Sequence, residues 1–440
     1  MGIKVVKFGG SSLADAEHFR RAGNIVRADP SRRFVVVSAP GKRTAGDRKV
    51  TDLLYHCYEL AHRGDSTEFC DAELADRYEA IVRGLGLQFD LPSELEKIKE
   101  MIWKHAGKDF VASRGEYLNA RIFAKYLGFD FVDAAEVIFF DENGNYEEEK
   151  TRNTMREVLR RHRYAVIPGF YGALPDGTIK TFSRGGSDIT GSIVACAAEA
   201  DLYENWTDVS GCLMADPRIV PDPKPIRILT YRELRELSYM GASVLHEEAV
   251  FPVHNAGIPI NIRNTNDPDA PGTMIVPGTN AYDPEHVITG IAGKKGFSVI
   301  TIEKGRMNAE LGFGRRILNV LEENEIPFEH LPSGVDTMSV ILPTSALCRD
   351  GCRERILSTV TRLANPDSVV IEDGMALLAV VGRGMVKATG TAARIFGALS
   401  AAGIHIRMID QGSGESGIIL GVEESALEEA IRAIYGAFVR

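Results

Sequence analysis

Near the start of the chain, the residue types best suited to chemistry form the run Lys7-Phe8-Gly9-Gly10-Ser11-Ser12. The β-branched residues of 3–8 predict a strand, and the spacing of apolar residues after the run predicts a helix. A strand that ends in two glycines before a helix lets bare backbone N–H groups approach a phosphate, and Lys7 would add an ammonium group there. The run therefore indicates a phosphate site, although a tight turn with serine N-caps would give the same pattern.

A second glycine turn, Ser183-Arg184-Gly185-Gly186-Ser187-Asp188, follows a strand-like segment and precedes an apolar helix expected over residues 188–200. Arg184 could hold a carboxylate or a phosphate through two parallel hydrogen bonds. Ser187 or Asp188 could instead be only the N-cap of the helix, and the two roles are compatible. The two glycine turns are far apart in the sequence, so a shared site requires that their strands end side by side in one sheet.

A third polar run, Thr207-Asp208-Val209-Ser210-Gly211, ends a strand-like segment and continues to Asp216-Pro217-Arg218. Side chains such as Thr207 and Asp208 at a strand end can hold ribose or purine groups, and Arg218 can reach a nucleotide phosphate. Taken alone, this run is a weak loop signal. The dinucleotide-binding and Walker A fingerprints do not occur in the context that they require, so a Rossmann dehydrogenase is disfavoured.

Length and composition limit the classes of function. The chain has 440 residues with 51 Lys+Arg and 61 Asp+Glu, a formal net charge of −10, and 44% of its residues are apolar. The length suggests about three globular domains, and the negative charge argues against nucleic acid as the main partner. No apolar run is long enough for a membrane span. The six scattered cysteines and the missing signal-peptide features predict a cytoplasmic protein with reduced thiols and no metal site built by protein ligands.

The elements that must position these motifs follow an α/β pattern. Unbroken apolar strands such as residues 34–37 and 165–167 are typical of a parallel sheet that is buried on both faces. Such strands alternate with helices, and residues 52–128 are expected to be mostly helical. Chain breakers over residues 266–285 predict a boundary after this part.

Beyond the boundary, one small unit with the strand and helix order of a ferredoxin-like motif is expected twice. The first copy contains the predicted strand 298–302, helix 315–324, and strands 327–331 and 339–342. The second copy contains the predicted strand 376–381, helix 390–402, strands 405–409 and 417–422, and helix 425–438.

The ordered set of motifs resembles the aspartate kinases (aspartokinases), a family of the amino acid kinase superfamily. The resemblance covers essentially the whole chain. Besides the three runs above, it is carried by Val37-Ser38-Ala39, Thr51 and Ser113-Arg114-Gly115-Glu116. In this order the motifs are highly specific.

The resemblance implies a fold and a domain organisation. An α/β kinase domain, an amino acid kinase-like three-layer α/β/α sandwich, would span residues 1–284. Two ferredoxin-like (ACT) α+β units would form a regulatory region over residues 285–440. The first ACT unit would span about residues 295–370, and the second would span about residues 371–440 together with strand 287–292.

The implied activity is ATP-dependent phosphorylation of the β-carboxylate of L-aspartate to 4-phospho-L-aspartate, the first step towards lysine, threonine, methionine and diaminopimelate. Such a transfer requires positioning and neutralisation of charge, without a covalent intermediate. By resemblance, Lys7 would stabilise the transferring phosphoryl group together with the N–H groups of Gly9 and Gly10, and Asp188 would orient Lys7. The implied aspartate pocket consists of Ser38, Thr51, Glu116, Arg184 and Ser187.

The same resemblance implies a nucleotide site. Thr207, Asp208 and Arg218 would contact ATP, and Mg²⁺ would bridge the phosphates with mostly water ligands. The sequence departs from the family at Ser243, where many members carry a lysine that approaches the phosphates, and at Leu213, where some carry a nucleotide-binding tyrosine. We therefore expect Arg218, or another lysine, to supply more of the phosphate contact.

The regulatory region is expected to bind an amino-acid effector, lysine in the first place, with threonine as the alternative. The implied effector site is a loop and helix start of the first ACT unit with an acidic partner, although an ordinary helix N-terminus would give the same pattern. Its residues would be Met307, Glu310, Gly312, Phe313, Gly314, Glu329 and Ser333. ACT units pair through strand edges, so a homodimer or a dimer of dimers is expected. Because no dehydrogenase segment follows, we expect a monofunctional kinase.

Two other functions stay open from the sequence. Another amino acid kinase, acting on glutamate, acetylglutamate, carbamate or UMP, would have similar catalytic residues. An inactive amino-acid sensor would keep the fold and only bind, but the presence of Lys7, Glu116, Arg184 and Asp188 disfavours it.

Overall fold

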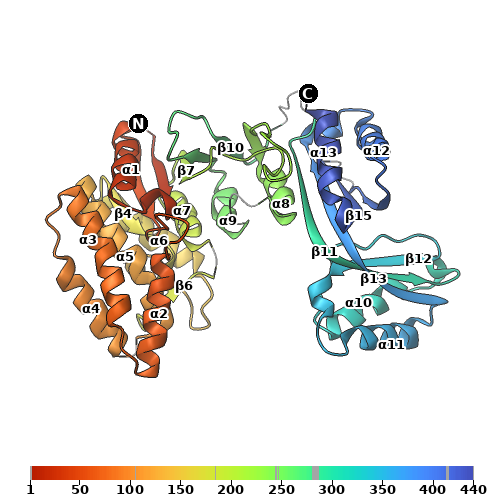
Figure 1. The fold of residues 1–440 in the computed structure, drawn as a ribbon, viewed down its shortest axis with the longest axis horizontal. Helices are drawn as coiled ribbons and strands as arrows, with labels where there is room; N and C mark the ends of the chain where they lie inside the picture. Colours follow the sequence, from red (N-terminus) through yellow and green to blue (C-terminus); the bar gives the residue numbers. More distant parts are fainter. Residues whose placement is uncertain are drawn as a thin grey trace. The chain divides into compact units, whose positions relative to one another are not determined.

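The computed structural model of the chain describes residues 2–104, 106–183, 185–242, 245, 247–279, 287–412 and 416–439. Two of the predicted site residues, Arg184 and Ser243, lie outside the described residues. Two compact units share the chain (Figure 1). The first contains Met1–Cys212, Pro225–Tyr231 and Val244–Thr279, and the second contains Leu213–Lys224, Arg232–Ser243 and Asn280–Arg440.

A mostly parallel sheet forms the middle of the first unit. Its strands are β1 (Lys4–Phe8), β2 (Arg32–Val37), β3 (Asp130–Phe131), β4 (Ala165–Pro168), β7 (Leu202–Thr207), β8 (Ile228–Thr230), β9 (Ile260–Asn264) and β10 (Thr273–Val276). Within the described residues they pair in the order β3-β4-β2-β1-β7-β9-β10-β8. All neighbours from β3 to β9 run parallel, and β10 runs antiparallel to β9. The central strands are buried on both faces, which explains their unbroken apolar sequences.

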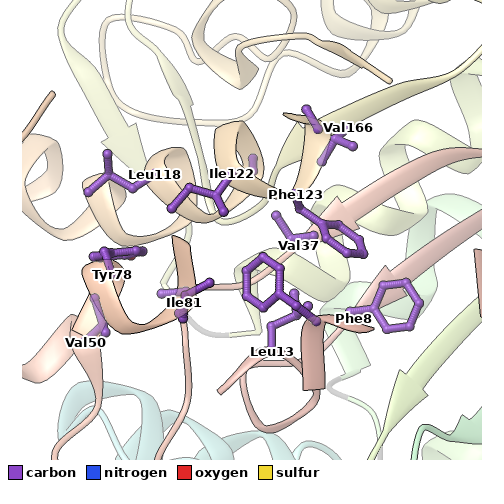
Figure 2. Packing of buried hydrophobic residues seen from close by; sticks show 14 of the residues in the cluster. Phe8, Leu13, Val37, Val50, Tyr78, Ile81, Leu118, Ile122, Phe123 and Val166 are labelled. Carbon is purple, nitrogen blue, oxygen red and sulfur yellow. The ribbon is translucent and has the colours of Figure 1, made fainter. Parts of the chain in front are cut away.

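Helices cover both faces of this sheet and complete the expected three layers. One face carries α1 (Ala16–Ala28), α2 (Val50–Arg63), α3 (Glu68–Leu85), α4 (Leu91–Trp103) and α5 (Lys108–Leu127). The other carries α7 (Gly186–Ala197), flanked by α6 (Glu148–Arg161) and α9 (Glu247–Ala256). Figure 2 shows the core on the first face, where Phe8 of β1 packs with Phe123 of α5. Because successive strand residues point to opposite faces, Lys7 points towards α7.

Local sequence signals set the ends of the helices. The Asp15 side chain caps α1 by accepting two backbone N–H bonds of its first turn. α2, α3 and α5 end at glycines in the left-handed conformation, Gly64, Gly86 and Gly128. These stops divide the predicted helical stretch 52–128 into separate helices. Among the helices that the described residues form, none has both the length and the apolar character needed to cross a bilayer.

The second unit is built on one antiparallel sheet that serves both ferredoxin-like repeats. Its strands are β11 (Gly290–Glu303), β12 (Thr337–Pro343), β13 (Ser368–Val381), β14 (Ile406–Asp410) and β15 (Gly417–Glu423), paired in the order β12-β11-β13-β15-β14 in the described part. Its helices are α10 (Phe313–Glu323), α11 (Cys352–Ala364), α12 (Thr391–Ala401) and α13 (Leu427–Phe438). β11 and β13 are long strands that pair with each other through both repeats.

The sequence prediction was wrong in two details of this unit. The segments predicted as separate strands, 287–292 and 298–302, contribute to one continuous strand, β11. No regular strand forms over the described residues 327–331, where an isolated bridge joins His330 to Ile341. Pro327 and Pro332 have no N–H to donate to a ladder, which explains why this segment makes no regular pairing.

Two segments that precede the predicted boundary pack with the second unit. They are residues 213–224 and residues 232–243, and the latter include most of α8 (Tyr231–Tyr239). Glu233 of α8 is 1% exposed; it accepts a hydrogen bond from Thr289 Oγ1 at 2.7 Å and pairs with Arg383 Nη1 at 2.8 Å. The sequence did not predict this packing, because the chain breakers that predict the boundary lie after both segments, over residues 266–285.

Candidate active site

The carboxyl ends of five parallel strands in the described sheet lie at one edge of the first unit. Because β1, β2, β4, β7 and β9 run in the same direction, the loops that follow them share this edge. Ligand crevices of α/β sheets form at such edges. The loops begin with Gly9, Ser38, Gly169, Asp208 and Thr265.

The two glycine turns meet at this edge through an ion pair. Lys7 near the end of β1 is 7% exposed, and its Nζ lies 2.6 Å from Oδ1 of Asp188. Asp188 stands in the first turn of α7, where its backbone N–H donates to Gly185 O at 2.8 Å. The juxtaposition of Lys7 and Asp188 that a shared site requires is therefore present.

The diglycine of the first turn allows a close approach of two loops. A Cβ on Gly10 would lie 2.8 Å from the Ala39 carbonyl oxygen, and Gly41 N donates to Gly10 O at 2.8 Å. Gly9 N–H donates to the Trp206 carbonyl oxygen at 3.1 Å. In this structure the sheet edge uses the Gly9 N–H donor, and the expectation that Gly9 takes part in phosphate binding stays a prediction. The predicted role of Gly10 likewise stays a prediction.

Glu116 lies in the middle of α5 with its carboxyl group buried. Burial raises the pKa of Glu116 to about 7 from 4.5, opposed by a backbone hydrogen bond at Ala39 and by the charges of Arg114 and Lys7. Within the described residues, no group hydrogen-bonds its Oε2. A buried carboxylate oxygen with no partner is costly unless a ligand supplies one.

The loop after β2 is held in place by α5. Asn119 Nδ2 donates to Ser38 O at 2.6 Å, and a Cβ on Gly115 would lie 2.8 Å from the Ala39 Cβ. Thr51 is half-buried at the start of α2, the helix that follows this loop. These contacts place the predicted residues Ser38 and Thr51 on loops and helix starts around the same edge.

Ser187, next to Asp188 in the first turn of α7, is 9% exposed. It packs against the loop after β4, since a Cβ on Gly169 would lie 2.6 Å from the Ser187 Oγ. The strand ends of β1 and β4 therefore both contribute to the surroundings of this helix turn. Arg184, predicted to bind a substrate carboxylate, lies outside the described residues.

The loops after β7 and β9 form the other side of the edge. Thr207 Oγ1 donates to Asp208 Oδ1 at 3.1 Å, and Thr265 N donates to Thr207 O at 2.8 Å. Ser12 and Thr265 share a buried hydroxyl–hydroxyl hydrogen bond of 2.7 Å. Thr265 was missed from the sequence, although the polar run 264–266 after an apolar strand was a usable signal. The first glycine turn and the predicted nucleotide loop are thereby linked.

Arg218 does not belong to the unit that carries Lys7. It lies in segment 213–224 of the second unit, with its side chain 86% exposed, and pairs with both oxygens of Asp216 at 2.6 to 3.1 Å. Ser243, which replaces the family's lysine, lies outside the described residues. The phosphate contacts of Arg218 and Ser243 therefore stay predictions.

The predicted effector residues lie in the loop before α10, at the start of α10, and in the segment before β12. Met307 and Phe313 are buried in the core of the first repeat, whose helix α10 begins after Gly312 with φ +76°. Glu310 pairs with Lys304 Nζ at 2.6 Å and with Arg316, and the hydrogen bond from Lys304 lowers the pKa of Glu310.

The remaining predicted effector residues lie on the segment before β12 and in α10. Glu329 accepts a hydrogen bond from the Tyr239 hydroxyl, and Ser333 Oγ donates to Leu331 O at 3.4 Å. Gly314 stands in the first turn of α10. In the part of the chain that the structure describes, no three His, Cys, Asp or Glu side chains gather as a metal site.

Comparisons with known proteins agree with this architecture. The model of the amino acid kinase family matches residues 2–264, and the model of an ACT domain matches residues 378–438. Aspartokinase 3 of Bacillus subtilis is 42% identical to the chain, over 99% of this chain and 98% of its own length.

Solved structures show the same likeness. The aspartate kinase of Clostridium acetobutylicum matches with a TM-score of 0.89 and 51% identity, over 100% of both chains. Aspartokinase III of Escherichia coli has the same fold at 24% identity, with TM-scores of 0.74 for its complex with aspartate and ADP (R-state) and 0.72 for its complex with lysine and aspartate (T-state). The family match over more than half of the chain and the full-length likeness to Aspartokinase 3 place this protein in the amino acid kinase family, among the aspartokinases.

Proposed function

We propose that the carboxyl edge of the first sheet is where this aspartate kinase transfers the γ-phosphoryl group of ATP to the β-carboxylate of L-aspartate. The products are ADP and 4-phospho-L-aspartate, and the reaction opens the pathway to lysine, threonine, methionine and diaminopimelate. The observation that carries this placement is the buried Lys7 ammonium group, 2.6 Å from Asp188, where two glycine turns meet. The full-length likeness to aspartokinases favours aspartate over the other acceptors and over a sensor without activity.

The physical task of the site is to bring an anionic carboxylate to a polyanionic triphosphate. The Lys7 ammonium group would reduce this repulsion and stabilise the charge that develops on the transferring group. Asp188 would hold Lys7 in position, and Gly10 would add a backbone donor. No general base is required, because the substrate carboxylate is already ionised at pH 7, well above its pKa of about 3.9.

The aspartate pocket would use the buried carboxyl group of Glu116. Its Oε2, which has no partner within the described residues, and its interaction with Lys7 support a position where the ammonium group of aspartate could bind. Ser38, Thr51 and Ser187 would surround the substrate, and Arg184 would bind one of its carboxylates. Holding both reactants in line is then the main catalytic contribution.

The nucleotide would bind at the side of the edge formed by Thr207 and Asp208. The linked hydroxyl groups of Ser12 and Thr265 support this placement, because they join the glycine turn to the Thr207 loop. ATP would enter as its Mg²⁺ complex, and the ion, held through the nucleotide, would neutralise part of the phosphate charge. Arg218 and Ser243 remain candidates for phosphate contact.

The domain assignment made from the sequence is part of the proposal. Residues 1–284 would be catalytic and residues 285–440 regulatory, with lysine as the effector and threonine as the alternative. The E. coli aspartokinase III complex with lysine, described as the T-state, supports lysine. The free thiols of Cys196, Cys212, Cys348 and Cys352 support a reducing compartment, the cytoplasm.

Lys7→Met tests the placement of the transferring phosphoryl group. We expect kcat to fall by about 10²- to 10³-fold, because the variant loses a charge that acts mainly in the transition state. The KM for aspartate is expected to change little. A coupled assay of ADP formation measures both, with Lys104→Met as the control, because the Lys104 side chain is 69% exposed. A kcat of Lys7→Met equal to that of the control contradicts the proposal.

Glu116→Gln tests the ammonium site through pH. With a pKa of about 7, ionisation of Glu116 is expected to make kcat/KM for aspartate rise as pH increases up to about 7 and then level off. Glu116→Gln is expected to lose this rise and to have a low kcat/KM throughout.

Stability gives an independent check of the same group. Because the folded pKa is raised from 4.5, ionisation of Glu116 destabilises the folded wild type as pH increases through 7. At pH 8 Glu116→Gln is therefore expected to be more stable in urea by about 3 kcal/mol, a difference that disappears near pH 4.5. Equal pH profiles of the variant and the wild type, in rate and in unfolding, would be inconsistent with a buried Glu116 of raised pKa.

Glu329→Gln tests the effector site. Lysine is expected to inhibit the wild type, and the variant is expected to need about tenfold more lysine for half inhibition, because a charged hydrogen bond is lost. Glu325→Gln, on an 83% exposed side chain in the same repeat, is the control. Titration calorimetry with lysine measures binding directly. Unchanged lysine binding in Glu329→Gln would show that the effector binds elsewhere.

The oligomer tests the last part of the proposal. β12 and β14 are the outer strands of the described five-stranded sheet, and Ile409 of β14 is 51% exposed, so we expect copies of the chain to pair through these edges. Light scattering is expected to give at least twice the mass of one chain. Ile409→Lys is expected to shift this mass towards one chain, whereas Met101→Lys, 42% exposed in the first unit, is not. A wild type with the mass of a single chain, with and without lysine, contradicts the pairing.

A further inference from the structure

A buried amide side chain lies in β7, beside Lys7. Asn205 is 3% exposed, in the middle of a strand that is buried on both faces. A buried amide costs free energy unless it is hydrogen-bonded, and an aliphatic β-branched residue suits such a position better. The hydrogen-bond partner of the Asn205 amide therefore indicates the role of this residue.

Asn205 and Lys7 are opposite each other in the parallel pairing of β7 with β1. Asn205 Nδ2 donates to Asp188 Oδ1 at 2.8 Å, and Lys7 Nζ lies 2.6 Å from the same oxygen. Two neighbouring strands thus present an amide and an ammonium group to one carboxylate oxygen in the first turn of α7.

A second residue of β7 holds the same helix turn. Tyr203, two residues before Asn205 and on the same face of the strand, donates its hydroxyl to the Asp188 carbonyl oxygen at 3.3 Å. Burial raises the pKa of Tyr203 well above its usual value, so this hydroxyl stays a donor. A Cβ on Gly191 would collide with it, which shows how closely the helix lies against the strand. Both the backbone and the side chain of Asp188 are therefore held from β7.

Lys7 has two roles that compete for its charge. In the structure it pairs with Asp188, and in the proposed reaction it must also stabilise the transferring phosphoryl group. A partly buried carboxylate that Lys7 alone held would lose its partner whenever Lys7 turned to the phosphoryl group, which is unfavourable. The amide of Asn205, which is hydrogen-bonded to Asp188 Oδ1, would stay there through this change.

We propose that Asn205 is a positioning residue for phosphoryl transfer: its amide holds the Asp188 carboxylate in place so that Lys7 can direct its charge to the transferring group. The inference rests on the proposed function of this site. Asn205 is assigned no contact with either substrate, so its removal is expected to affect the chemical step and not the binding of aspartate.

The test compares Asn205→Ala with Asn261→Ala in the full chain. Asn261 is the matched control, since it is a buried asparagine, 9% exposed, on the neighbouring strand β9, in register with Glu204. For Asn205→Ala we expect kcat to fall by about ten- to a hundredfold, the effect of losing a hydrogen bond to a charged group, with KM for aspartate nearly unchanged. Asn261→Ala is expected to lose stability and keep its kcat.

A double variant separates positioning from a general structural role. In the Asp188→Ala background, Asn205→Ala is expected to change kcat no further, because the group that it positions is absent. An equal fall in both backgrounds overturns the proposal, and so does a kcat of Asn205→Ala within about twofold of the wild type. If Asn205→Ala does not fold, Asn205→Asp keeps the shape, places a second carboxylate against Asp188, and is expected to lose at least as much kcat.

The wild-type assay distinguishes this inference from the function on which it rests. Wild-type protein that forms no ADP in response to aspartate would reject the proposed function and this inference together. Active wild type and active Asn261→Ala, with an unimpaired Asn205→Ala, would reject the inference alone.

Discussion

The ion pair between Lys7 and Asp188 is the contact on which the candidate site depends. It joins the central strand β1 to the first turn of α7, two elements that are far apart in the sequence. The Lys7 side chain is largely removed from water, so its charge requires a partner. This requirement keeps the strand end, the helix start and their glycine turns together, and it leaves an ammonium group at the edge where a phosphoryl group and a carboxylate have to meet.

Successive side chains of β1 point to opposite faces of the sheet, so one face packs into the core and the other carries Lys7. Val6 and Phe8 enter the core beneath α5, whereas Lys7, between them, points to α7. A shift of one residue in the pairing would exchange these faces and bury the ammonium group in an apolar core. Parallel neighbours on both sides of β1 prevent such a shift, because its register is set twice, by β2 and by β7.

In the second unit, the constraint on the structure is a shared sheet. The two repeats share the long strands β11 and β13, so neither repeat has a sheet of its own. Most of α8 is anchored to this unit through the buried carboxylate of Glu233, which binds Thr289 and Arg383. α8 begins at Tyr231, the last residue of a segment of the first unit, and its other residues belong to the unit that carries the expected effector residues.

The α/β class, most of the strands, the glycine turns and the repeat were determined by the sequence itself, because apolar periodicity and turn-forming residues act locally. Lys7 could be nominated in the same way, whereas the role of Asp188 came from the resemblance to the aspartate kinases. Tertiary structure decided which groups meet: Gly9 N–H is used by Trp206, Thr265 joins the glycine turn, and Asn205 shares Asp188 with Lys7. It also decided that two predicted strands merge into β11. These outcomes depend on contacts between residues distant along the chain, and a pattern read over a few neighbouring residues does not contain them.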